Sequence, residues 1–144
     1  MCVYIHRMAP EHAAEFAECR ECRCFAVRKA SRAVTHHYDR ALRKTGMRVS
    51  QFNTLTVLTQ TGPLPMQNLA EFMGLDRTSL TRNLQPPVRK RWIRVVASDE
   101  DRRVRIVSIT PAGIAALRKA VPAWRAAQAG VDEVLKQSGL AVVK

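Results

Sequence analysis

The 144-residue sequence has no segment that would anchor it in a membrane and no motif for an enzyme's chemistry. No apolar run approaches the roughly 18 residues that a membrane-spanning helix needs, and residues 1–16 lack the continuous apolar stretch of a signal peptide. None of the six glycines falls in a G-x-G-x-x-G pattern, and no nucleophile is paired with a base. We therefore expect a cytoplasmic protein that is not an enzyme and needs no cofactor.

Acidic residues are scarce relative to basic ones. The chain has 24 Lys and Arg against 12 Asp and Glu, a formal net charge of +12. Nine of the basic residues lie within residues 76–105. A basic excess suits a nucleic acid or an anionic membrane surface and cannot distinguish between them. Sequence motifs must therefore distinguish between these two kinds of partner. The length of the chain suits one domain with one core.

The most informative stretch begins with a predicted amphipathic helix. Asp76 is a favourable N-cap, because its carboxylate accepts hydrogen bonds from the free amides of the first turn. Leu75, Leu80 and Leu84 recur at helical spacing and indicate the buried side. This pattern favours a recognition helix over an ordinary solvated helix. Residues whose donors suit phosphates and base edges are Arg77, Thr78, Ser79, Thr81 and Arg82.

Two segments rich in β-branched residues follow, at Trp92–Val96 and Arg103–Ile109. They predict a two-stranded hairpin, or wing, with a polar turn between the strands. Guanidinium groups at its tip suit a narrow minor groove of DNA. We expect a carboxylate–guanidinium pair to orient the wing arginine at the tip. The charged residues of the wing are Asp101, Arg102, Arg103 and Arg105.

Helical periodicity and stop signals predict two helices before this stretch. Residues 24–44 contain no Pro or Gly and predict a long first helix, which Gly46 ends. Ser50 is the expected N-cap of a second helix, which the Thr-Gly-Pro sequence at 61–63 ends.

A short third helix and a long last helix complete the prediction. Pro65 suits the first turn of a helix over residues 66–73. Thr110 is the expected cap of a last helix that continues past Pro122, where a kink is expected. The chain therefore predicts a mainly α fold with a small β-hairpin wing (α+β), a winged helix-turn-helix between long N- and C-terminal helices.

These motifs, in this order and spacing, resemble the MarR family of transcriptional regulators over roughly residues 24–128. The resemblance rests on Ser50-Gln51-Phe52, Leu69-Ala70-Glu71, Leu75-Asp76-Arg77-Thr78-Ser79-Leu80-Thr81-Arg82, Asp101-x-Arg103 and Ile109-Thr110-Pro111-x-Gly113.

The resemblance implies a single MarR-like domain over residues 1–144 that forms a homodimer. Segments 1–45 and 110–144 would supply the dimerisation helices, and residues 46–109 the winged helix-turn-helix. Two lobes would bind successive major grooves of a pseudo-palindromic operator on double-stranded DNA, with repression as the expected result. The alternative is a basic structural or RNA-binding winged-helix module that responds to no effector.

Two positions depart from the family pattern. Pro86 and Pro87 fall where the family continues its recognition helix, so we expect an early end or a kink there. Arg91 stands in the place of a glycine at the turn into the wing.

Three cysteines, Cys19, Cys22 and Cys24, precede or enter the first helix. Cys24 and Tyr38 resemble the oxidised cysteine and the supporting tyrosine of the family's organic-hydroperoxide-sensing branch. Nearby arginines and the helix N-terminus would favour the thiolate. The resemblance thus implies redox sensing at Cys24, with Cys22 or Cys19 as partners. The alternative is that Cys24 is a small buried side chain.

Other ligand sites have weaker support. His37 and Tyr38 are candidates for an effector cavity, as in family members that bind small aromatic acids. A zinc site would need the thiols together with Cys2, His6 or His12, but no second C-x-x-C or paired-histidine motif completes it, so we predict no metal site.

Overall fold

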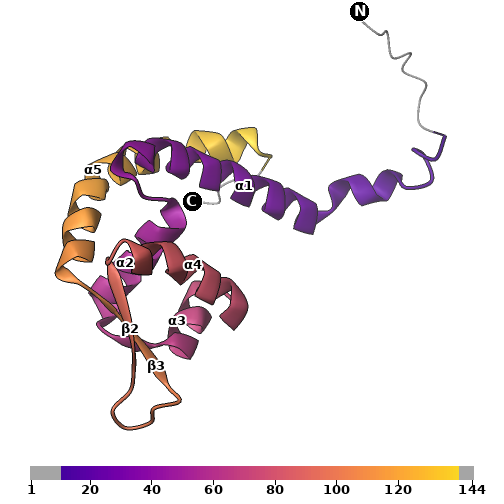
Figure 1. Cartoon of the computed structure of the whole chain (residues 1–144). Coiled ribbons are helices and arrows are strands. Elements are labelled where there is room, and N and C mark those ends of the chain that lie inside the picture. The colour runs from indigo at the N-terminus through magenta and orange to yellow at the C-terminus, as the bar shows by residue number, and fades with distance from the viewer. Residues whose placement is uncertain (1–10, 140–144) are drawn as a thin grey trace, which may run out of the picture.

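The computed structural model of the chain describes residues 11–139, in which a small antiparallel sheet lies at the edge of a group of helices (Figure 1). This confirms the predicted mainly α fold with a small β component. The candidate zinc ligands Cys2 and His6 lie outside the described residues. The helices and strands are α1 (Arg23–Leu42), α2 (Val49–Thr61), β1 (Leu64–Pro65), α3 (Met66–Met73), α4 (Arg77–Arg89), β2 (Ile93–Ala97), β3 (Arg105–Ile109) and α5 (Pro111–Gln137), with short 3-10 turns at Ala17–Glu21 and Arg43–Thr45.

Most helix ends lie where the sequence predicts them. Gly46 and Gly74 follow α1 and α3 in the left-handed conformation, at φ 71° and 62°, which is the conformation that favours glycine at a helix end. Thr110 caps α5 by accepting a hydrogen bond from the Gly113 amide at 3.1 Å. The α5 helix continues through Pro122, as predicted.

The predicted cap of α2 was wrong, because the helix begins one residue before Ser50. Arg48 occupies the N-cap position. The Val49 amide donates to Asp39 Oδ1 of α1 at 2.8 Å, and the Arg48 amide donates to Gln51 Oε1 at 3.1 Å. These acceptors satisfy the first free amides of α2, and Asp39 comes from another helix, so local sequence could not indicate this cap.

The wing belongs to a three-stranded sheet of order β1-β3-β2, so the prediction of a two-stranded hairpin was incomplete. In β2, Val95 lies opposite Val107, and in β1, Leu64 lies opposite the same residue. A two-residue strand is too short to show alternation, which explains why β1 was missed. The second wing strand begins at Arg105, so Arg103 lies in the turn.

The core lies where α1, α2, α3, α4 and the sheet meet. Burial of each leucine there contributes roughly 1.5–3 kcal/mol. Its fully buried members include Leu42, Leu55, Leu58, Leu69, Leu80 and Val107.

Helix α5 rises from the sheet and runs beside α1 (Figure 1). The rings of Phe52 and Trp124 stack with centroids 5.6 Å apart, which packs α5 on α2. His37 Nε2 lies 2.8 Å from the Ala127 carbonyl, and the Tyr38 hydroxyl donates to Gln128 Oε1. Within residues 11–139, no helix is both long and apolar enough to cross a bilayer.

Candidate nucleic-acid interface

The first turn of α4 is held by its cap. Asp76 Oδ1 accepts from the Ser79 amide at 2.8 Å, and Oδ2 accepts from the Ser79 hydroxyl at 2.6 Å. The side-chain bond and then the backbone bond from Ser79 hold the pKa of Asp76 below its usual value. The predicted N-cap is confirmed. Ser79 was predicted to contact DNA, but its hydroxyl donates its one hydrogen bond to the Asp76 carboxylate of the cap.

The remaining predicted contacts of α4 lie on its exposed side. Leu80 and Leu84 are buried on the opposite side, as their spacing predicted. Thr81 donates its hydroxyl to the Arg77 carbonyl at 2.8 Å, so its oxygen remains available only as an acceptor. Within residues 11–139 neither α4 arginine on this side forms an ion pair. The exposed residues are Arg77, Thr78, Thr81 and Arg82.

The predicted early end of α4 was wrong, because the helix continues through Pro86 and Pro87 to Arg89. Proline has a helical φ but removes a backbone donor, which disfavours a helix interior by about 3 kcal/mol. Here Pro87 is fully buried and extends the apolar stripe of Leu80 and Leu84 at helical spacing. Packing of this stripe against the core offsets the lost hydrogen bonds and keeps α4 at 13 residues.

Arg91 occupies the position in the turn after α4 where the family usually has a glycine. It is left-handed at φ 58°, the sole non-glycine residue with a positive φ in the part of the chain that the structure describes. Its amide donates to the Val88 carbonyl and the Trp92 amide to the Pro87 carbonyl, both at 2.9 Å. This is a Schellman ending. The Lys90 ammonium, 4.4 Å from the Trp92 ring centroid, also donates to the Gly46 carbonyl and braces the turn.

Asp101 orients the wing, but through the backbone. Its Oδ1 accepts from the Arg103 amide at 2.9 Å, and its carbonyl accepts from the Val104 amide at 2.9 Å. No ion pair joins Asp101 to the Arg103 guanidinium in the described residues, so the predicted side-chain pair is absent. The guanidinium groups of Arg102, Arg103 and Arg105 thus form no ion pair within residues 11–139, and all three residues are exposed.

A cavity of about 570 Å³ brings α4 and the wing together. Arg77 from α4 and Arg103 and Arg105 from the wing line the same hollow. Gln67 and Asn68, at the start of α3, line it as well and are exposed. These two amides were not among the predicted contacts, although they form the polar side of a predicted helix. Glu71 and several apolar side chains complete the lining, so the arginines and amides are the groups in this hollow that could donate to phosphates.

The three cysteines of the described chain are free and exposed, so the alternative of a buried Cys24 is wrong for a single chain. Cys24 lies in the first turn of α1, and Tyr38 lies fourteen residues further along the same helix. That separation is about 21 Å along the helix axis, so the two cannot share a pocket within one chain. No cluster of three metal-ligating side chains is present among residues 11–139.

A separate cavity of about 340 Å³ lies between α1, α2 and α5. Tyr38, Asn53, Trp124 and Gln128 are among the residues that line it. Burial raises the pKa of Tyr38. His37, predicted beside Tyr38, does not line this cavity and instead joins α1 to the Ala127 carbonyl of α5.

The known proteins to which this chain is similar are transcriptional regulators. The model of the MarR family matches residues 48–104. The transcriptional regulator MosR of M. tuberculosis, solved in complex with DNA, is 43% identical, with 78% of this chain and 82% of that chain covered and a TM-score of 0.72. MarR of E. coli, at 20% identity and a TM-score of 0.63 over 77% of this chain and 80% of that chain, shares the fold.

A curated relative is more distant. The HTH-type transcriptional regulator MhqR of Bacillus subtilis is 29% identical over 94 residues, or 65% of this chain. The match spans 65% of MhqR, slightly less than two thirds of that protein's length.

Proposed function

This chain belongs to the MarR family of transcriptional regulators, and from that premise we propose that it binds a specific double-stranded DNA sequence through α4 and the wing. MarR regulators are DNA-binding proteins and not enzymes, which confirms the prediction of no enzymatic activity. One observation carries the proposal. Arg77 of α4 and Arg103 of the wing are exposed, free of ion pairs within residues 11–139, and line one cavity.

Each element has its own task in this proposal. The exposed side of α4 enters the major groove, where Arg82 can pair with the O6 and N7 acceptors of guanine. The wing loop projects beyond the helices (Figure 1). In this proposal its Arg102 and Arg103 enter the minor groove. Arg77 and Arg105 contact phosphates between the two grooves.

We further propose that the protein acts as a homodimer. The start of α1 carries Phe25 and Val27, whose residues are 61% and 55% exposed and so have little cover within one chain. Segments 1–45 and 110–144 join the protomers, while each copy of residues 46–109 binds half of a pseudo-palindrome. The half-sites lie about 34 Å apart. Light scattering should return about twice the 16.2 kDa mass of one chain, and a 16.2 kDa particle would contradict the dimer.

The regulator acts in this proposal as a cytoplasmic repressor whose release has two candidate signals. The first is oxidation of Cys24, with Cys22 or Cys19 as a disulfide partner, and it is supported by the exposure of all three thiols. The second is a small aromatic effector in the cavity that Tyr38 and Trp124 line. A promoter fused to a reporter should be silent with the protein and active without it.

Binding-site selection from random DNA duplexes tests the proposal, followed by titration of the selected site. Arg82→Ala should reduce discrimination at one base pair by about 1–3 kcal/mol. Arg103→Ala should weaken binding to every sequence and lower the salt slope by about one. Arg118→Ala, an exposed arginine of α5, is the control. Equal affinity for random DNA and structured RNA would favour the alternative RNA-binding or structural module.

A further inference from the structure

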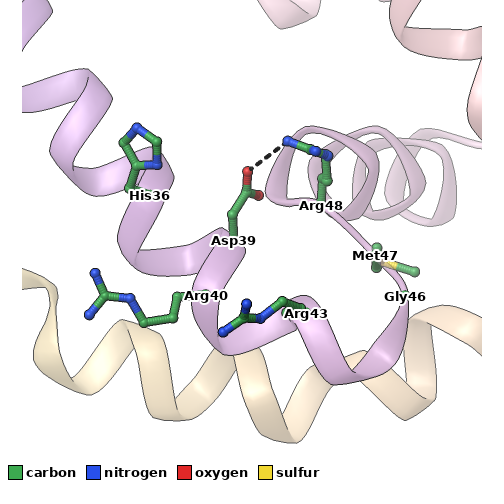
Figure 2. Close-up of a pocket in the computed structure, with 7 residues that line it drawn as sticks. All are labelled: His36, Asp39, Arg40, Arg43, Gly46, Met47 and Arg48. Carbon is green, nitrogen blue, oxygen red and sulfur yellow. Dashed lines mark ion pairs between the residues drawn. The ribbon is translucent and has the colours of Figure 1, made fainter.

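The corner between α1 and α2 is hollowed into a cavity of about 530 Å³, shown in Figure 2. We propose that this cavity binds a phosphate group, free or carried by a small hydrophilic molecule. The inference goes beyond DNA binding and does not depend on it. The polar residues that line the cavity are His36, Asp39, Arg40, Arg43 and Arg48.

Helical spacing places three of these residues on one side of α1 and of the 3-10 turn that continues it, which begins at Arg43. His36, Arg40 and Arg43 are separated by four and three residues, so they lie above one another on the helix surface. In Figure 2 the side chains of Arg40, from α1, and Arg43, from the turn that follows it, extend in the same direction. Arg48 approaches from the start of α2, and buried Met47 fixes the turn between the helices.

The cavity has more positive than negative charge. Asp39 is its single carboxylate, and both oxygens are engaged. Oδ1 accepts from the Val49 amide at 2.8 Å, and Oδ2 lies 3.6 Å from Arg48 Nη1. Arg40 and Arg43 form no ion pair anywhere in residues 11–139. Two guanidinium groups therefore remain free for an anion.

The chemistry of the lining selects the class of anion. Guanidinium groups bind phosphate oxygens in pairs, with two parallel N–H donors each. Residues three apart on a helix stand about 5–6 Å apart at Cβ, so Arg40 and Arg43 can hold one phosphate together. Among the described residues, no Phe, Tyr or Trp lines the cavity, which disfavours the aromatic acids that the Tyr38 cavity suits. The volume exceeds that of a phosphate ion and leaves room for a hydrophilic body.

The cavity is also distinct from the proposed DNA surface. Gly46 lines it and accepts a hydrogen bond from Lys90, which follows the C-terminal end of α4. The arginines proposed to contact DNA lie near the start of α4, and the 13-residue helix is about 20 Å long. A phosphate in this cavity is therefore not a DNA phosphate of the same complex.

Calorimetric titration of the full chain without DNA tests the proposal. The probes are glucose 6-phosphate, inorganic phosphate and salicylate, at an ionic strength matched with sodium chloride. We expect saturable binding of a phosphate probe, weakened at least tenfold in the double variant Arg40→Ala/Arg43→Ala. The matched control is Arg118→Ala/Arg125→Ala, which removes two exposed arginines of α5 and should change affinity less than twofold.

The affinities of the probes and variants, compared with one another, identify the ligand class. Tighter binding of glucose 6-phosphate supports a phosphate ester, and equal binding of inorganic phosphate supports the free ion. Arg40→Lys/Arg43→Lys, which retains the charge without the guanidinium fork, should bind more weakly than wild type. Circular dichroism checks that each variant folds. The proposal is overturned if neither phosphate probe binds saturably, if both double alanine variants lose equal affinity, or if salicylate alone binds.

Discussion

Gly113 is the residue at which the fold has the least room for a side chain. A Cβ atom there would lie 2.1 Å from the Trp92 carbonyl oxygen and 2.8 Å from Ile109 Cγ1. The Trp92 carbonyl cannot easily retreat, because it accepts from the Thr110 amide at 2.9 Å. Close approach of the start of α5 to the end of the α4–β2 turn therefore requires glycine.

Gly113→Ala should accordingly destabilise the protein. The inserted methyl group must push α5 away from Trp92, an overpacking that typically costs about 1–3 kcal/mol. Urea denaturation measures the change in the free energy of unfolding. Ala112→Gly, at the exposed neighbouring position, is the control and should cost no more than about 1 kcal/mol. An unchanged urea midpoint for Gly113→Ala would show that α5 does not approach Trp92 so closely.

The cap of α4 should make stability depend on pH. Hydrogen bonds from Ser79 lower the pKa of Asp76 from its usual 3.8. Its stabilising contribution is therefore complete above that value and is lost as the pH falls through the lowered pKa. Asp76→Ala should melt at a lower temperature than wild type at neutral pH, and the difference should shrink in acid. Asp132→Ala is the control, and a difference that stays constant into acid would argue against the cap.

At the level of single elements, the local sequence pattern predicted a helix boundary correctly where that boundary depends on residues next to it in the sequence. Asp76, Gly74 and Thr110 mark helix boundaries by side-chain chemistry or backbone freedom, and all three predictions are confirmed. The exposed arginines of α4 followed from the same periodicity. Asp39 and the β1 strand could not be predicted, because each acts through a partner distant in sequence.

The continuation of α4 past its two prolines also could not be predicted from local sequence. Local rules for Pro86 and Pro87 predicted an early end or a kink, yet the helix does not end there, and burial of Pro87 beside Leu84 stabilises it. Tertiary packing therefore outweighed local propensity here. Similarly, the wing turn keeps its shape although Arg91 replaces glycine, because hydrogen bonds to the Pro87 and Val88 carbonyls hold it.

At the end of α4, substitution by glycine should change the stability of the protein in opposite directions at two positions two residues apart. Arg91→Gly should stabilise the protein by about 0.5–1 kcal/mol, the left-handed penalty of roughly 1–2 kcal/mol less the entropy that glycine loses on folding. Arg89→Gly, inside the last turn of α4, should instead destabilise it by up to about 1 kcal/mol. Urea denaturation compares the two variants. Destabilisation by Arg91→Gly would show that the arginine side chain itself holds the turn.

For the whole molecule, the position of Cys24 decides how oxidation could reach the DNA surface. Cys24 lies at the exposed start of α1, far from α4 and about 21 Å along the helix from Tyr38. A change at this thiol can therefore affect DNA binding only through the way two copies are joined. A bridge from Cys19 to Cys22 would constrain little, because the two residues are one turn apart.

Mild peroxide should thus lower the affinity for the selected operator tenfold or more, equivalent to about 1.4 kcal/mol or more. The reason is geometric. In the proposed homodimer, oxidation at Cys24 would add polar bulk, or form a disulfide, where the first helices meet, and the spacing of about 34 Å between the recognition helices would depend on that contact. Operator titration before and after peroxide measures the effect. Cys24→Ser should abolish the response, and Cys19→Ser should weaken it at most. If oxidised wild-type protein binds as tightly as reduced protein, release must instead come from an effector in the Tyr38 cavity.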